Sequence, residues 1–171
     1  MKLAFLGRMC SGKSTLAKYM VAKYGYEKYS CAGALKNIAK HIGMIGKDRT
    51  LLQNLGYAIR QHDNCFFSNI IQKEVHGKEC VVVDDVRYIE EYQALKNEGF
   101  VFIKLCMFDD VRFQRMMDMG LNINKSEIYH DSENQIDMLP YDYIITATTT
   151  STKVDDIEQL EKILSLIGFA I

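Results

Sequence analysis

The sequence predicts an α/β protein in which helices cover both faces of a mainly parallel sheet, a three-layer α/β/α architecture. The first observation is a set of short apolar runs at residues 2–6, 80–83 and 100–106 that do not alternate with polar residues. Such runs are typical of strands buried on both faces. The second is that amphipathic helical patterns separate these runs, as strand–helix–strand units require.

The individual elements follow from periodicity and from glycine punctuation. A first helix leaves the segment after residue 14 and ends at Gly25, and a short strand or extended link covers 26–30. The stretch 50–75 forms two helices or one bent helix. The remaining helices are expected over 32–42, 88–97, 109–119 and 154–167, with a last strand over 143–146. At 171 residues, the chain 1–171 is expected to form one domain.

Composition excludes several classes of protein. The net charge is −1 and no basic run occurs, so nucleic acid is not expected as a partner. No apolar stretch reaches about 18 residues, so no membrane span is expected. A strand begins at once, which leaves no room for a signal peptide. The five cysteines are spread without a C-x-x-C pair, which indicates a reduced, cytoplasmic protein, and Cys80 and Cys106 are expected in the core.

The residues Gly7-Arg8-Met9-Cys10-Ser11-Gly12-Lys13-Ser14 match G-x-x-x-x-G-K-[ST], the phosphate-binding P-loop. The glycines let the loop curl so that backbone N–H groups face phosphate oxygens, and the following helix directs its positive end at the same anion. Lys13 is expected to reach the β- and γ-phosphates and Ser14 to ligate Mg²⁺. The predicted nucleotide-binding residues are Gly7, Arg8, Cys10, Ser11, Gly12, Lys13, Ser14 and Thr15.

A second motif is the apolar strand 81–83 that ends in Asp84 and Asp85. This is the Walker-B arrangement, in which an aspartate holds Mg²⁺ directly or through water. Either carboxylate is a candidate metal ligand. The alternative is that Asp85 only caps a helix.

Arginine is the rarer cation, and its planar fork suits phosphate. Arg87 follows the second motif and is placed at the C-terminal edge of the sheet, where ligands bind. Arg112 and Arg115 lie three residues apart, on one face of a helix that precedes a polar segment. They are expected at the foot of a lid that covers the phosphates; the alternative is a solvated helix surface. These parts suit phosphoryl transfer, which depends on positioning and charge neutralisation.

Later segments resemble, in order, motifs of the deoxynucleoside monophosphate kinases. The segment 29–36 is similar to their A-x-x-L-K stretch, and 52–60 to L-Q-x-x-G-x-x-x-R. The segment 85–91 resembles D-V-R-F-x-x-E, with tyrosine in place of phenylalanine. Residues 130–133, with Asp137 after them, resemble H-x-S-E…D. Two positions depart from the pattern: Asp84 stands where a small residue is common, and 147–150 stands where an Asn/Gly-rich turn is common.

The resemblance implies a nucleoside monophosphate kinase fold with a five-stranded parallel core, an acceptor-binding region at about 30–75 and a lid at about 112–132. It implies that ATP and Mg²⁺ are used and that a nucleoside 5′-monophosphate accepts the phosphoryl group. Arg112 and Arg115 would neutralise the transferring group, with Lys13 and Arg87 also in the catalytic set. The acceptor phosphate would be held by Lys36, Arg60 and Arg87, and Ser132 and Glu133 would lie near the acceptor or support the lid.

Two alternatives stay open. The animal-type phosphomevalonate kinases share much of the pattern, including a D-x-R turn and an R-x-x-R spacing, and use the same chemistry on another acceptor. A GTP-dependent switch is a different class; residues 122–127 faintly resemble its N-K-x-D motif but carry Glu127 in place of aspartate. The accepted base, the sugar and the oligomeric state are not determined by the sequence, and a homodimer stays open.

Overall fold

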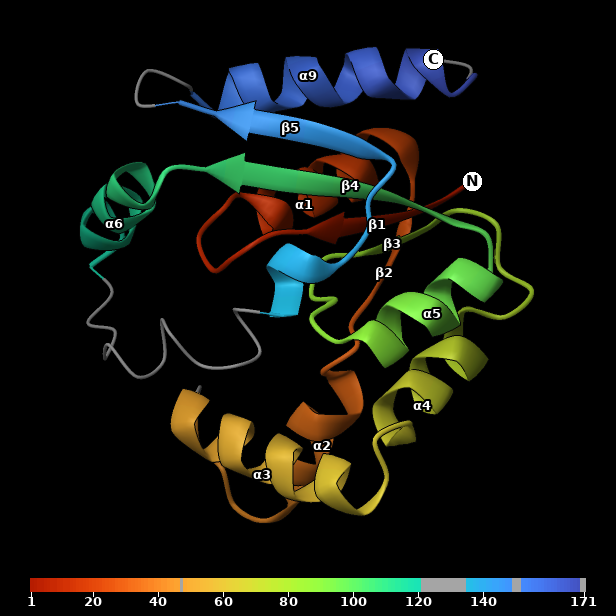
Figure 1. Cartoon of the computed structure of the whole chain (residues 1–171), viewed down its shortest axis with the longest axis vertical. Helices are drawn as coiled ribbons and strands as arrows, with labels where there is room; N and C mark the ends of the chain where they lie inside the picture. The colour runs from red at the N-terminus through yellow and green to blue at the C-terminus, as the bar shows by residue number, and fades with distance from the viewer. Residues whose placement is uncertain (47, 121–134, 149–151, 170–171) are drawn as a thin grey trace.

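The computed structural model describes residues 1–46, 48–120, 135–148 and 152–169. Its centre is a five-stranded sheet with the strand order β2-β3-β1-β4-β5, and every neighbouring pair of strands is parallel (Figure 1). The strands are β1 (Lys2–Leu6), β2 (Glu27–Tyr29), β3 (Val81–Val83), β4 (Phe100–Met107) and β5 (Tyr143–Ala147). The predicted parallel sheet of five strands is therefore confirmed.

Helices cover both faces of this sheet. Helices α1 (Lys13–Tyr24) and α9 (Lys153–Leu166) pack on one face, and α4 (Phe66–Val75) and α5 (Ile89–Asn97) on the other (Figure 1). In β1, Leu3 and Phe5 face the first pair of helices while Ala4 and Leu6 face the second, and all four are fully buried. Burial on both faces explains why the strand sequence does not alternate.

The remaining elements extend beyond the C-terminal ends of the strands. Helices α2 (Gly33–His41) and α3 (Arg49–His62) form a separate layer below the sheet, and α6 (Asp109–Asp118) follows β4 (Figure 1). A single 3-10 turn, η1 (Ile136–Met138), precedes β5. Ligands of parallel α/β sheets bind outside the carboxyl ends of the strands, so this side of the molecule is where a site is expected. None of the described helices has the length and apolar character needed to cross a bilayer.

The stretch 50–75 consists of two helices, because Asp63 is extended and ends α3 before α4 begins. Gly25 ends α1 as predicted, with φ of 68° and its N–H donating to the carbonyls of Met20 and Val21. Cys80, expected in the core, is instead exposed, because β3 begins one residue later and Cys80 lies at its entrance. Cys106 is half-buried near the end of β4.

Candidate active site

The loop between β1 and α1 has the backbone shape that a phosphate-binding loop requires. Gly7 and Gly12 have φ of 143° and 102°, which glycine adopts without strain. A Cβ atom at Gly7 would lie 2.6 Å from the carbonyl oxygen of Leu105 and 2.7 Å from Ser11 Oγ. Cys10 also has a positive φ, of 63°. The first glycine of the motif is therefore required both by its backbone angle and by the close approach of β4.

Lys13 lies over this loop at the first turn of α1. Its Nζ donates to the carbonyl oxygens of Gly7, at 2.5 Å, and of Arg8, at 2.7 Å. No side chain caps the helix at Gly12, and the first N–H groups of a helix have no acceptor within it. The N–H groups at the start of α1 and the nearby ammonium group of Lys13 are donors that suit the oxygens of a phosphate chain. The predicted nucleotide-binding residues are thus brought together in one loop and helix turn.

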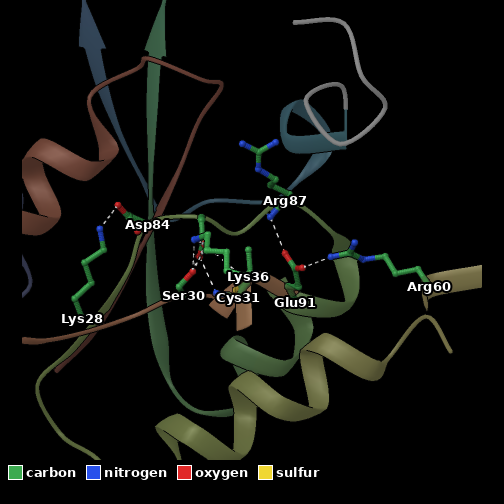
Figure 2. Close-up of polar contacts among 10 residues, drawn as sticks. Lys28, Ser30, Cys31, Lys36, Arg60, Asp84, Arg87 and Glu91 are labelled. Atoms are coloured by element: carbon green, nitrogen blue, oxygen red, sulfur yellow. Dashed lines mark hydrogen bonds and ion pairs between the residues drawn. The ribbon is translucent and has the colours of Figure 1, made fainter. Parts of the chain in front are cut away.

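Asp84 and Asp85 follow β3, next to β1 in the sheet, but their side chains have different surroundings. Asp84 is 6% exposed, and its Oδ2 lies 2.6 Å from Nζ of Lys28 on β2 (Figure 2). Ser14 is exposed in the first turn of α1, which follows the adjacent strand. A hydroxyl and a carboxylate, together with phosphate oxygens, are the donors that Mg²⁺ takes in proteins. Ser14 and Asp84 would therefore be the residues that hold the ion.

Asp85 is engaged by the segment that leaves β2. Its Oδ1 accepts from the backbone N–H of Cys31 at 2.7 Å, and its Oδ2 accepts from the N–H of Ala32 at 3.2 Å and from the hydroxyl of Ser30 (Figure 2). Lys36 Nζ lies 3.6 Å from the same oxygen. Asp85 thus does cap a backbone segment, but it is the one before α2 and not the helix that follows Asp85. Its role as a metal ligand stays a prediction, and the donors around it make Asp84 the better fit.

The predicted acceptor residues gather near α2, α3 and the start of α5. Lys36 Nζ donates to Ser30 Oγ at 3.0 Å. Arg60 on α3 donates through Nη2 to Glu91 Oε1 at 2.9 Å, and its guanidinium stacks on the ring of Tyr88, 3.7 Å from the ring centroid. These contacts bring Lys36 and Arg60 to the same side of the sheet as the turn that carries Arg87.

The acceptor side also contains a buried acid. Glu91 is 3% exposed on α5, and its Oε2 accepts from the backbone N–H groups of Arg87 and Tyr88, at 2.9 and 3.3 Å. Burial raises the pKa of Glu91, and the charge of Arg60 opposes that rise. The side chain of Arg87 points away from Glu91 (Figure 2). Arg87 and Arg60 are thus tied to one carboxylate, Arg87 through its backbone and Arg60 through its guanidinium.

The two arginines of α6 have different environments. Arg112 is 1% exposed and donates to Asp109 Oδ1 at 2.8 Å, while its Nε and Nη1 have no hydrogen-bond partner. Asp109 is the first residue of the helix, whose N-cap is Phe108. Arg115 Nη2 lies 3.7 Å from Asp156 Oδ2 on α9, and its Nη1 lies 3.6 Å from the position that a Cβ at Gly12 would take. Arg115 therefore lies beside the phosphate loop, and Arg112 is buried in the wall of a cavity that adjoins the same loop.

A cavity of about 360 Å³ adjoins the loop, between the end of β4, the start of α6 and η1. Arg8 lines it and donates through Nε and Nη2 to Asp137 Oδ2, at 3.0 and 2.5 Å. Lys104 lies on the same wall and donates to the backbone carbonyl of Asp137 at 3.1 Å. The segment after the predicted lid is thus fastened to the phosphate loop through Arg8.

Part of the predicted site lies outside the described residues. Ser132 and Glu133 fall there, as do the lid from residue 121 onward and the N-K-x-D-like stretch 122–127. Several residues of the described site were not singled out by sequence, among them Lys28, Tyr88, Glu91, Lys104 and Asp156. Tyr88 and Glu91 carry a sequence signal, since both are positions of the D-V-R-F-x-x-E pattern. Lys28, Lys104 and Asp156 are found from tertiary contacts.

No protein-family model matches the sequence, and no curated protein matches it. Solved structures do resemble the fold. The chain is similar to a shikimate kinase from Bacteroides thetaiotaomicron, with 16% identity, a TM-score of 0.56 and coverage of 98% of both chains. A gluconokinase from Sinorhizobium meliloti has 17% identity and a TM-score of 0.61, over 98% of this chain and 95% of that one.

A third similar structure is a shikimate kinase from Acinetobacter baumannii in complex with shikimate, with 14% identity and a TM-score of 0.61. It covers 97% of this chain and 92% of its own. At these identities the likeness establishes a shared fold over nearly the whole chain. The predicted α/β P-loop fold, with its five parallel strands, is confirmed.

Proposed function

We propose that this protein is an ATP-dependent kinase that phosphorylates a small molecule. The observation that carries the proposal is the complete phosphate loop, with the ammonium of Lys13 over it and the guanidinium of Arg115 beside Gly12. The loop and Lys13 would hold the triphosphate of ATP, and Ser14 with Asp84 would hold Mg²⁺. The fold shared with proteins named shikimate kinase and gluconokinase supports the same class of reaction.

In this reaction an acceptor oxygen forms a bond to the γ-phosphorus of ATP, and the bond from that phosphorus to the β–γ bridging oxygen breaks. ADP leaves with the electron pair. The bound metal would neutralise charge on the phosphate oxygens. Lys13 and Arg115 add fixed positive charge beside the same oxygens, which favours a transition state in which charge moves toward the leaving group.

We further propose that the acceptor is a (deoxy)nucleoside 5′-monophosphate. Lys36, Arg60 and Arg87 form a cationic group suited to a second phosphate. A phosphate monoester has a second pKa of about 6, so its oxygen is already ionised at neutral pH and needs no base. Asp85, which lies 3.6 Å from Lys36, accepts hydrogen bonds from three donors of this protein, so its oxygens are engaged by the segment before α2.

The second candidate is a kinase for another small acceptor, such as phosphomevalonate or a polyol acid. The similarity to proteins named shikimate kinase and gluconokinase favours this broader class. A hydroxyl acceptor would need a group to take its proton, so its rate should fall as that group protonates. A phosphate acceptor would instead follow the ionisation of its own second proton.

The test is ADP release measured with ATP and Mg²⁺ against a panel of acceptors. The panel contains the common ribo- and deoxynucleoside monophosphates, phosphomevalonate, shikimate and gluconate. Stimulation by a monophosphate supports the specific proposal, and stimulation by another member supports only the broad one. Slow hydrolysis of GTP with tight GTP retention, and no stimulation by any acceptor, would contradict both and favour a switch.

A further inference from the structure

We infer that Glu91 is a positioning residue that holds the two acceptor-site arginines, Arg60 and Arg87, in one fixed arrangement. The inference rests on the proposed function, because it takes the region around these arginines as the acceptor site. The supporting observation is that the buried carboxylate of Glu91 accepts hydrogen bonds both from the side chain of Arg60 on α3 and from the backbone of Arg87 in the turn after β3 (Figure 2).

The two oxygens of Glu91 serve two different elements. Oε1 accepts from the guanidinium of Arg60, and Oε2 accepts from the backbone N–H groups of Arg87 and Tyr88. The side chain of Glu91 is 4% exposed and that of Arg60 is 16% exposed. A buried carboxylate destabilises the fold unless hydrogen-bond donors surround it. Each of the two Glu91 oxygens therefore has to stay beside its own donors.

Aromatic rings fix the plane of the Arg60 guanidinium. The ring centroid of Tyr88 lies 3.7 Å from its Cζ, and the ring centroid of Phe67 lies 4.6 Å from the same atom. Tyr88 belongs to the same turn as Arg87. The turn therefore contacts Arg60 directly by stacking and indirectly through Glu91, which couples the positions of the two arginines.

Gly56, one helical turn before Arg60, leaves the space that this arrangement needs. It lies inside α3, where glycine is less favourable than alanine. A Cβ at this position would lie 3.0 Å from Nη1 of Arg60 and 3.1 Å from Cδ2 of Leu35. Helix propensity alone would favour alanine, so the glycine is consistent with close packing of Arg60 and Leu35 against this part of α3.

The decisive variant is Glu91→Gln. An amide has one acceptor oxygen, so it cannot serve both the guanidinium and the two N–H groups. Hydrogen bonds to charged groups are worth about 1.5–3 kcal/mol, so we expect KM for the acceptor found in the panel to rise about tenfold or more. KM for ATP should stay unchanged, because the phosphate loop is on another element. Glu90→Gln, the same change one residue earlier, is the matched control and should leave both constants unchanged.

A double variant separates positioning from general stability. If Glu91 acts through Arg60, Glu91→Gln should add much less to the acceptor KM in an Arg60→Ala background than it does in the wild type. Equal effects in both backgrounds, or an acceptor KM for Glu91→Gln equal to that of wild type, would overturn the inference. A wild-type protein without acceptor-stimulated turnover would instead contradict the proposed function.

Nuclear magnetic resonance without substrate also tests whether Glu91 positions the turn that carries Arg87. Backbone amide signals of Arg87 and Tyr88 should shift in Glu91→Gln and stay in place in Glu90→Gln. If the two signals stay in place in Glu91→Gln, the shared carboxylate does not hold the turn, whatever the kinetics show.

Discussion

Arg115 of α6 and Asp156 of α9 meet over the phosphate loop, with Nη2 and Oδ2 3.7 Å apart. A Cβ at Gly12 would lie 3.5 Å from Asp156 Oδ2 and 3.6 Å from Arg115 Nη1. The second motif glycine, the helix after β4 and the helix after β5 are therefore in contact at one point. This contact fixes where Arg115 can direct its charge.

We expect Asp156→Asn to lower kcat about tenfold with little change in acceptor KM, because the variant leaves Arg115 without its counter-charge beside the triphosphate. Burial raises the pKa of Asp156 above 3.8, and Arg115 opposes the rise without cancelling it. With a raised folded-state pKa, the contribution of Asp156 to the free energy of unfolding is largest below pH 3.8 and falls as pH rises. We therefore expect the free energy of unfolding of wild type, relative to that of Asp156→Asn, to be higher at pH 4 than at pH 7, as measured by urea unfolding.

Lys13→Ala should remove nearly all turnover, at least about a hundredfold, while the protein stays folded. The ammonium donates to the loop carbonyls of Gly7 and Arg8, and alanine cannot supply its charge. Lys18→Ala, an exposed lysine on the same helix, is the control and should keep wild-type turnover. Retained turnover in a folded Lys13→Ala protein, judged by ADP release and thermal melting, would count against the assignment.

Arg87→Ala and Arg60→Ala should both raise acceptor KM and leave KM for ATP alone. They should differ in their effect on Glu91. Arg60→Ala leaves the buried Glu91 without its counter-charge, so its melting temperature should fall by several degrees. Arg87 donates its backbone N–H to Glu91, and alanine keeps that hydrogen bond. Unchanged acceptor KM and kcat in both variants would mean that the acceptor binds elsewhere.

Lys28→Met should lower the Mg²⁺ concentration needed for half-maximal ADP binding, measured by calorimetry. The lysine lies 2.6 Å from Asp84 and competes with the ion for that carboxylate. A partly exposed pair is worth up to about 1 kcal/mol, so the shift should be about two- to fivefold. Lys78→Met removes a lysine of equal exposure that pairs with Glu27, and it should not change the Mg²⁺ requirement. A requirement that is unchanged in Lys28→Met would argue for Asp85 as the ligand.

Arg112→Met should raise the melting temperature by about 2–4 °C, because methionine removes a buried charge with two nitrogen atoms that have no hydrogen-bond partner. The partner Asp109 is half exposed and can be hydrated. Arg115→Ala should cost more turnover than Arg112→Met. The reverse order of turnover would restore the prediction that Arg112 neutralises the transferring group.

Sequence predicts well what depends on local pattern. Four of the strands, the loop of Gly7 to Ser14 and the carboxylates at the end of β3 follow from residue order, because a buried parallel strand and a curled glycine loop have local signatures. The segment 26–30 stays open between a strand and an extended link, because the short strand β2 is largely exposed. The different contacts of Asp84 and Asp85 cannot be predicted from local pattern. They depend on the pairing of β2 with β3, which brings Lys28 to Asp84 and Ser30 to Asp85.

The same limit applies to the arginines of α6. Their spacing of three predicts a common face, and it cannot tell which contact each guanidinium makes. Arg112 turns back to Asp109 on its own helix, whereas Arg115 reaches α9, some forty residues further along the chain. Packing between elements that are distant in sequence determines the partner of each guanidinium, so these partners can be identified only from the three-dimensional structure.

The position of β1 in the sheet has a consequence for synthesis on the ribosome. This strand pairs with β3 and β4 and with no strand nearer to it in sequence. A nascent chain must therefore emerge as far as Met107 before the first strand has both neighbours, although the strand itself is made first. Until β3 has emerged, the apolar residues of β1 have no partner strand, and one edge of β1 then stays unpaired until β4 follows.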